Sequence, residues 1–316
     1  MPDLRPTRDH DKVIIRFLDS YRGEKDKWHT AALGLLAEIG ALTLGREILD
    51  EIQKAGFNVY IQPAVAQGNQ CAAANKNCFI TLRQALMGGS SYSLSTELKK
   101  ATDRAKRAGM NIESIAKRLV FGMSAMTVET SRNVEKPIPG GGTLRKRDGY
   151  ERAGVARWKD AKMTEEKMLT LLKGLLDGSM GNADLANYQM MDGRSLAENL
   201  VRIFYQPYAG GSGMLVDAGA GCEATISFDP FKEDSCWNDV MVKRPPAVGL
   251  AHELIHAWRN VRGLRYFPDK EKRANAPTPD DEVMTTGFPP YNYEKFSENL
   301  IRAGWSPAAL DMRTAY

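Results

Sequence analysis

Long apolar runs and a dominant charge are both missing from this chain of 316 residues. No stretch approaches the roughly 20 apolar residues that a membrane-spanning helix needs, and residues 1–12 are polar, without the hydrophobic centre of a secretory signal. The 43 Lys and Arg residues against 39 Asp and Glu leave a formal charge of +4, which is too small to indicate a nucleic-acid partner. The composition, 43% hydrophobic, predicts a globular protein that neither inserts into a membrane nor binds nucleic acid.

Cysteine is scarce, and its spacing excludes the common thiol motifs. The four cysteines contain no Cys-x-x-Cys pair; they are Cys71, Cys78, Cys222 and Cys236. We expect free thiols, as in a reducing compartment, with a disulfide between Cys71 and Cys78 as the alternative.

Histidine is equally scarce, yet two of the four histidines form the most informative pattern in the sequence. His252 and His256 lie four residues apart, and Glu253 follows the first of them. On a helix both imidazoles would lie on one face, where they could reach a single Zn²⁺ with Glu253 beside the open coordination position. The alternative is a pair of ordinary helix histidines near a surface glutamate. Chance accounts poorly for this spacing, because His10 and His29 are the only other histidines.

The residues around this motif predict a helix over residues 247–261. Pro245 and Pro246 precede it, and Gly263 stands where a left-handed C-cap would fall. Apolar residues recur at spacings of three and four, which gives the helix a stripe to bury; they are Leu250, Leu254, Trp258 and Val261. We therefore expect the two histidines on a rigid, packed element.

A catalytic zinc site needs a third protein ligand, and the sequence leaves only carboxylates for it. No histidine follows His256 in this sequence. Residues 280–287 indicate a short helix ended by a glycine, which makes Glu282 the first choice. Glu298 is the alternative, although it could also be a surface acid on a helix over residues 293–302. The full set of downstream candidates is Asp269, Glu271, Asp280, Asp281, Glu282, Glu294, Glu298 and Asp311.

These residue types predict hydrolytic chemistry. A zinc ion lowers the pKa of its bound water toward neutrality and polarises the carbonyl of the bond to be cut. Glu253 would take the proton of that water and pass it to the leaving amine. The sequence therefore predicts a zinc hydrolase.

Three segments resemble clostridial neurotoxin light chains, which are zinc endopeptidases. The segments are His252–Ala257, Asp281–Gly287 and Arg313–Tyr316. The resemblance implies that Glu282 is a zinc ligand. Asp281 stands where the neurotoxins carry glutamate, and the spacing from His256 to Glu282 is shorter than theirs.

The same resemblance assigns a role to two residues near the end of the sequence. It implies that Arg313 and Tyr316 stabilise the charge that develops on the carbonyl oxygen. A guanidinium and a phenol can both donate hydrogen bonds to an oxyanion. Without the resemblance, both would be taken as ordinary surface residues.

Two further segments, Gly45–Ile52 and Ser297–Arg302, resemble the NleD-like family of bacterial type III secreted effector metallopeptidases. This family implies an α+β, zincin-like metalloprotease fold that is mainly helical, with a small mixed sheet and the His-Glu-x-x-His helix at the active site. It also implies delivery into the cytoplasm of a host cell and a host protein as substrate, such as a signalling kinase. The resemblance covers about a third of the chain, and residues 81–205 have no counterpart.

We therefore expect a secreted, gluzincin-like zinc metalloendopeptidase that acts as a monomer on a host protein. One alternative is a metal-containing binding protein that does not cleave. Glu253 favours the enzyme, because a structural zinc site has no use for an uncoordinated acid beside its ligands. Another alternative is a toxin metallopeptidase aimed at competing bacteria, with the same metal chemistry.

Domain organisation follows from these motifs. We expect a flexible N-terminal region at residues 1–25, compatible with an export signal, and a metallopeptidase domain at 26–316 with a helical insertion at about 81–205. The patterns predict helices at 12–21, 26–42, 46–54, 162–176 and 195–204, and mostly helix from 81 to about 130 with a break at 87–91. Glycine-rich loops are expected at 137–142 and 209–213.

Two segments have the features of strands. Residues 57–61 follow a helix-ending glycine, and residues 223–228 alternate polar with apolar side chains, as a half-buried strand does. We expect the second of these to be an edge strand before the metal helix, which could pair with an extended substrate.

Overall fold

The structure is a computed structural model that describes residues 2–7, 10–64, 68–89, 91–121, 129–137, 143–152, 158–191, 194–205, 214–232, 234–236, 239–266, 280–288, 291, 293–306 and 308–313. Within these residues the chain has an α+β fold with eleven α-helices and a five-stranded mixed sheet. The predicted fold class is confirmed at this level.

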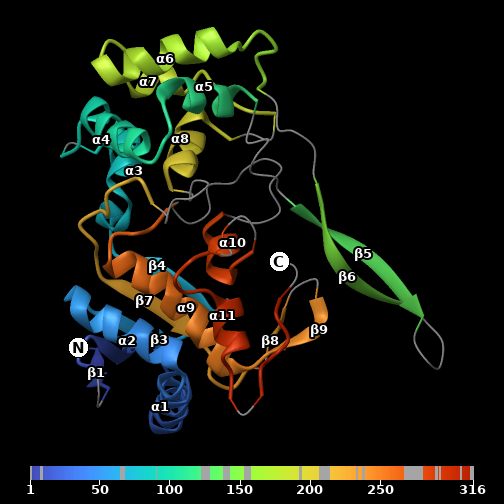
Figure 1. Ribbon diagram of the computed structural model, residues 1–316. Coiled ribbons are helices and arrows are strands. Elements are labelled where there is room, and N and C mark those ends of the chain that lie inside the picture. Colours follow the sequence, from blue (N-terminus) through green and yellow to red (C-terminus); the bar gives the residue numbers. More distant parts are fainter. Residues whose placement is uncertain are drawn as a thin grey trace.

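The sheet has the strand order β1-β2-β3-β7-β4 (Figure 1). The three central strands run parallel, and each outer strand is antiparallel to its neighbour. Parallel pairing needs long crossover connections, and here α1 and α2 form one of them. The strands are β1 (Asp3–Pro6), β2 (Val13–Phe17), β3 (Val59–Pro63), β7 (Ala224–Phe228) and β4 (Gln70–Ala73).

The two faces of the sheet differ in polarity. Buried and half-buried residues alternate along β2, β3 and β7, so one face is apolar. On the other face, Arg16 donates hydrogen bonds to Gln62 at 2.7 Å and Thr225 at 3.2 Å, and its guanidinium lies over the Tyr60 ring. This difference decides which side the helices cover.

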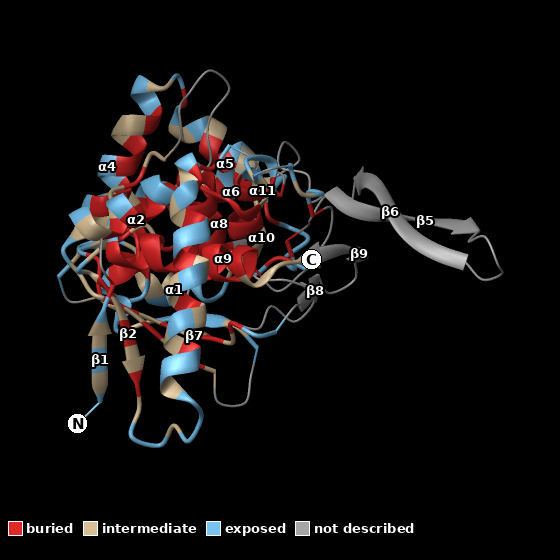
Figure 2. Ribbon diagram, turned by 90° about the horizontal axis from the view of Figure 1, so that it is seen from below, coloured by how far each residue is buried: buried red, intermediate tan, exposed pale blue. Residues whose placement is uncertain are grey.

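Three helices pack with the apolar face in one hydrophobic core. They are α1 (Lys25–Ala41), α2 (Thr43–Ala55) and α9 (Pro246–Val261). In α2, the residues Ile48, Leu49 and Ile52 form the buried stripe, and Gly56 ends the helix at φ 81°. Residues 247–261 of α9 are all buried, which places this helix at the centre of the molecule (Figure 2).

A second hydrophobic core lies among the helices between β4 and β7. Figure 1 shows most of these helices gathered at one end of the molecule, with α10 (Asp280–Thr286) between them and α11 (Glu298–Ala303), which lies beside α9. Tyr266, Met284 and Tyr291 extend this second core toward α9. The helices are α3 (Thr81–Leu86), α4 (Leu94–Arg107), α5 (Ile112–Val120), α6 (Glu165–Asp177), α7 (Asn182–Leu185) and α8 (Leu196–Tyr205).

Two strand pairs lie outside the main sheet. Both are antiparallel. They are β5 (Glu129–Pro137) with β6 (Thr143–Arg152), and β8 (Asp234–Cys236) with β9 (Asp239–Arg244). The sequence patterns did not indicate either pair.

Most predicted helices are confirmed. The predictions at 26–42, 46–54, 162–176 and 195–204 correspond to α1, α2, α6 and α8. The segment predicted as mostly helical from 81 contains α3, α4 and α5, with its break between α3 and α4. Residues 138–142 and 209–213 of the predicted loops lie outside the described residues.

The helix predicted at 12–21 is wrong. β2 lies there, paired with β1 on one side and β3 on the other. Val13, Ile15 and Phe17 are buried at a period of two, so the apolar residues of this segment serve a sheet rather than a helix. Residues 1–25 thus contain the two strands β1 and β2, where a flexible region was expected.

The prediction that residues 223–228 form an edge strand is also wrong. β7 is a strand, but it pairs with β3 on one side and with β4 on the other. β4 is too short and weakly patterned to be recognised in the sequence. The strand predicted at 57–61 is β3, shifted by two residues.

Cys71, Cys78 and Cys222 are free thiols. The alternative disulfide between Cys71 and Cys78 is therefore not formed. Among the described residues, no helix has both the length and the apolar character needed to cross a bilayer.

A pair of glycines tests the packing of α1 against α2. A Cβ atom on Gly45 would lie 2.0 Å from the carbonyl oxygen of Ile39, whereas one on Gly34 would meet nothing within 4 Å. We expect Gly45→Ala to lower the free energy of unfolding by more than about 1 kcal/mol. Gly34→Ala, the control, should raise it by about 0.5–1 kcal/mol, because alanine favours the helix. Urea unfolding measures both, and equal effects would contradict this packing.

Candidate metal centre

α9 carries the two histidines of the motif and holds them rigidly. Pro246 begins the helix, where its missing N–H is not needed. Gly263 follows its end at φ 67°, and a Cβ atom there would lie 2.2 Å from the carbonyl oxygen of Gly219. The predicted helix and its glycine terminator are confirmed.

His252, His256 and Glu282 converge on one point. Their Nε2 and carboxylate oxygen atoms form a group that could hold a metal ion. The two Nε2 atoms are 3.1 Å apart, and Glu282 oxygens lie 3.0 Å from that of His252 and 3.3 Å from that of His256. α10, the next described helix after α9, supplies Glu282, so the group joins two helices.

These separations suit a tetrahedral zinc ion. Zinc bonds of 2.0–2.2 Å to nitrogen and oxygen, at tetrahedral angles, separate neighbouring ligand atoms by about 3.3 Å. Two imidazole nitrogens and one carboxylate are also a donor set that zinc accepts. Within the described residues the group contains three ligands, as in catalytic sites that keep a fourth position open.

The other nitrogen of each imidazole is also occupied. His252 Nδ1 lies 2.9 Å from Glu298 Oε2, and His256 Nδ1 lies 3.1 Å from Asp281 Oδ2 and 3.3 Å from the Thr285 hydroxyl. Carboxylates in these positions fix the ring orientation and favour the tautomer with a proton on Nδ1. Nε2 is therefore the nitrogen of each ring that is available to a metal ion.

Glu298, the alternative ligand from the sequence, therefore lies behind His252 rather than in the converging group. Its side chain is fully buried; Arg302 Nε donates a hydrogen bond of 2.8 Å to Oε1, and Nη2 of the same arginine forms an ion pair of 2.8 Å with that oxygen. Arg313 donates to Oε2 at 3.2 Å, and Arg244 lies 3.7 Å from the same oxygen. Burial alone would raise the pKa of Glu298, but Arg244, His252 and Arg313 hold it well below its usual range.

Asp281 holds the second histidine in a similar way. Burial would raise the pKa of its carboxyl, but His256 and Arg265 lower it, and an Arg265 nitrogen lies 3.9 Å from Oδ2. Thr285 donates to the Asp281 carbonyl oxygen at 2.7 Å and accepts from Arg259. Arg259 also reaches Glu294 at 3.4 Å, so that acid is occupied away from the metal group.

His256 lies in a strongly negative environment. Burial opposes its charged form, but Glu282 and Asp281 more than offset that effect and raise its pKa well above the usual value. A metal ion at Nε2 would have to displace the proton held there. Metal binding at neutral pH is therefore coupled to proton release from this residue.

Glu253 lies next to the converging group but is not part of it. Its side chain is buried, at 4% exposure, and burial raises the pKa of its carboxyl. Within the described part of the chain, no hydrogen bond to its carboxylate is present. Glu253 is thus a buried acid beside the group and not one of its candidate ligands.

The structure describes only one of the two terminal residues. Arg313 is buried, and its guanidinium contacts Glu298. Tyr316 lies outside the described residues, as do the candidate acids Asp269 and Glu271.

Sequence reasoning missed the residues that surround the histidines. Of these, Arg302 had a local signal, because it lies four residues after Glu298 on the same helix. Asp281 was predicted only as one of the candidate third ligands, whereas it contacts Nδ1 of His256. Arg244 and Arg265 gave no signal, because only the folded chain brings them to the site.

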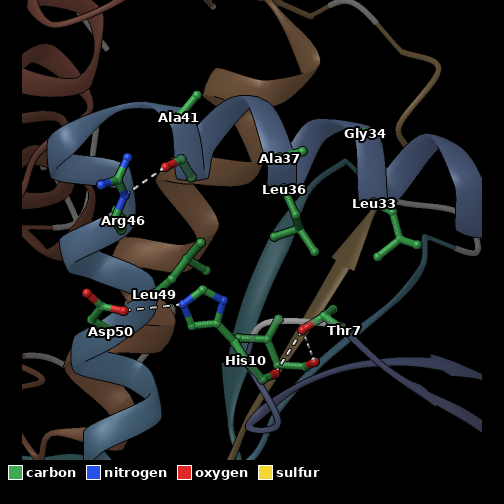
Figure 3. Close-up of a pocket in the computed structure, with 12 residues that line it drawn as sticks. Thr7, His10, Leu33, Gly34, Leu36, Ala37, Ala41, Arg46, Leu49 and Asp50 are labelled. Carbon is green, nitrogen blue, oxygen red and sulfur yellow. Dashed lines mark hydrogen bonds and ion pairs between the residues drawn. The ribbon is translucent and has the colours of Figure 1, made fainter.

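A surface groove of about 770 Å³ between α1 and α2 is separate from this centre (Figure 3). His10 points toward Asp50 there, with 3.4 Å between Nε2 and Oδ1, and Arg46 donates to the Gly40 carbonyl oxygen. One imidazole beside one carboxylate does not provide a metal group. The group on α9 and α10 is therefore the better candidate for a metal site than this groove.

Comparison with known proteins gives one match. A model of the Peptidase_M91 family, described as an effector protein, matches residues 155–316, slightly more than half of the chain. The match includes α6, α9, α10 and α11, and with them every residue of the converging group. No curated protein and no solved structure matches the chain.

Paired substitutions separate a ligand from an orienting residue. We expect Glu282→Ala to abolish metal binding, because it removes one of three ligands. Glu298→Gln should keep one metal per chain with an affinity about 10- to 100-fold weaker, because the amide still accepts from Arg302 but orients His252 less well. Metal content and competition with a chelator measure both. Full occupancy in the first variant and none in the second would make Glu298 the third ligand.

Proposed function

The chain belongs to the Peptidase_M91 family of effector proteins, and from that premise we propose that it is a zinc endopeptidase that acts on a host protein. The observation that carries the proposal is the convergence of His252, His256 and Glu282 beside a buried, uncoordinated Glu253. Bound zinc would supply a Lewis acid that polarises a peptide carbonyl and makes water acidic enough to attack it. The three converging side chains would hold the ion.

Glu253 is the proposed general base. Its raised pKa brings the carboxyl closer to neutrality, which suits a group that must first accept a proton and then return it. In peptide hydrolysis it would take the proton of the attacking water and deliver it to the amine that leaves. Its place directly after His252 on a rigid helix keeps it close to the reacting atoms.

Arg313 and Tyr316 are the proposed donors to the developing oxyanion, as the resemblance to neurotoxin light chains implies. Arg313 contacts Glu298, and Glu298 in turn contacts His252. Removing Arg313 would still leave Glu298 with the hydrogen bond and the ion pair from Arg302. The role of Arg313 in catalysis can therefore be tested without dismantling the metal group.

Secretion through a type III system into a host cell, and a signalling kinase as the substrate, are finer proposals that rest on the NleD-like resemblance. We also propose residues 26–316 as one metallopeptidase domain, with residues 81–205 as a region for substrate recognition. The uncoordinated Glu253 favours cleavage over mere binding, since a structural metal site needs no such acid. One zinc ion per monomer is the expected form.

Glu253→Gln separates metal binding from cleavage. We expect this variant to keep its fold and its zinc, yet to lose cleavage by several orders of magnitude, because the attacking water has no proton acceptor. Host lysate is incubated with wild type, with the variant, and with wild type plus chelator, and new N-termini are mapped. The proposal predicts N-termini that arise with wild type alone. Their formation by the variant at the wild-type rate would refute the role of Glu253.

The donors near the end of the sequence need a separate test. We expect Arg313→Ala and Tyr316→Phe to keep zinc and to lower kcat, because their hydrogen bonds strengthen as charge builds on the carbonyl oxygen. Met312→Ala, at a side chain that is 56% exposed, is the neighbouring control and should have no effect. Rates are measured on a mapped peptide. Full turnover after deletion of residues 313–316 would eliminate both roles.

A further inference from the structure

Two cysteines that are distant in sequence meet in a small buried cluster away from the metal group. Cys78 ends the short 3-10 helix Lys76–Cys78, and Cys222 precedes β7. The two side chains pack together with Phe79 in a core of their own. Their exposures are 0% and 2%.

Backbone hydrogen bonds hold the two segments side by side. Gly221 donates to the carbonyl oxygen of Asn77 at 2.8 Å, and the next residue on each segment is a cysteine. Cys222 itself donates to the carbonyl oxygen of Asn260 at 3.0 Å, near the end of α9. The main chain thus holds the two cysteine-bearing segments next to each other, as a disulfide requires.

The glycines around the pair leave it little freedom. Cβ atoms on Gly219 and Gly221 would lie 1.8 Å from the carbonyl oxygen of Phe79 and 2.3 Å from that of Val261. Gly221 also has a φ of 78°, which favours glycine. The backbone before Cys222 therefore packs closely against the backbone of Phe79 on one side and of Val261 on the other.

The two thiols also interact with each other. They are neighbours in the same small core, and the Cys222 thiol also donates to the carbonyl oxygen of Asn75 at 3.3 Å. The hydrogen bond from Cys78, opposed by burial, lowers the pKa of Cys222 to about 6, and the pKa of Cys78 is raised. One acidified thiol beside a protonated partner is the arrangement of dithiols that undergo exchange.

We propose that Cys78 and Cys222 are a redox-active pair that forms a reversible disulfide with small-molecule disulfides as the oxidant. The Cys222 thiolate attacks one sulfur of the oxidant, forming a mixed disulfide and releasing one small thiol. Cys78 then loses its proton and attacks the Cys222 sulfur, forming the protein disulfide and releasing the second small thiol. Two protein thiols are oxidised and one small disulfide is reduced. Because both cysteines are buried, exchange follows local opening.

The position of the pair connects it to the rest of the molecule. Arg265 donates its backbone N–H to the Cys78 carbonyl oxygen at 3.0 Å, while its guanidinium lies 3.9 Å from Asp281. A bond between Cys78 and Cys222 would join the β4–α3 connection to the start of β7. It would thus restrain the segment that positions Arg265, whose guanidinium is close to Asp281, the residue that contacts His256 Nδ1.

The test uses the full chain in buffers that range from reduced to oxidised glutathione. Thiols are blocked by alkylation at acid pH, and peptides are mapped without reduction. The proposal predicts one linked peptide pair, Cys78 with Cys222, that rises with the oxidised fraction and disappears again on reduction. Cys71→Ser, the control at a half-buried thiol, should leave the link unchanged. No linked pair in fully oxidised glutathione, or a link through Cys71, would overturn it.

A second measurement separates exchange chemistry from simple proximity. The rate of alkylation of Cys222 is followed against pH in wild type and in Cys78→Ala, with circular dichroism to confirm the fold. Loss of the donated hydrogen bond should move the midpoint of the profile upward, toward the value of an ordinary thiol. An unchanged midpoint would show that Cys78 does not activate Cys222. Neither measurement depends on peptidase activity.

Discussion

Charge compensation inside the protein is the condition that allows the metal group to form. Three acids around α9 are buried, and a buried carboxylate without a partner costs several kcal/mol. Each is matched by at least one cation: Glu298 by Arg302 on its own helix and by Arg313, Asp281 by Arg265, and Glu294 by Arg259. These pairs also fix how α10 and α11 lie against α9. The same contacts that neutralise the acids therefore place the imidazole rings.

The arrangement also explains why the chain needs its second core. Tyr205, on α8, donates to Glu294 at 3.2 Å, and its ring packs against Tyr266. Arg259 shares that glutamate, so one buried network links α8 to the metal helix. The family match begins at residue 155 and leaves out β1, β2, β3, α1 and α2. The ligands thus lie in the matched half, while much of the sheet beneath them comes from the other half.

Features that depend on the spacing of nearby residues could be predicted from the sequence. Features that depend on contacts between distant segments could not. A period of four places both histidines on one helix face, and a glycine marks the end of that helix, so α9 could be predicted from its own residues. Glu282 could be ranked above Glu298, because a capped helix start is a local signal, but that Glu298 faces Nδ1 of His252 depends on tertiary packing. Val13–Phe17 was predicted as helix because the partner strands β1 and β3 cannot be seen in that segment alone.

The position of β7 limits how a chain could extend this sheet. Both edges of β7 are already used, by β3 and by β4, so its N–H and C=O groups are not available to a further strand. Among the described strands only the outer edges of β1 and β4 remain, and each strand is four residues long. Four residues span about 13 Å, enough for two or three backbone hydrogen bonds. A bound peptide segment would therefore gain little binding energy from main-chain pairing with this sheet. Selectivity among peptide sequences would depend on contacts between the side chains of the peptide and those of the protein.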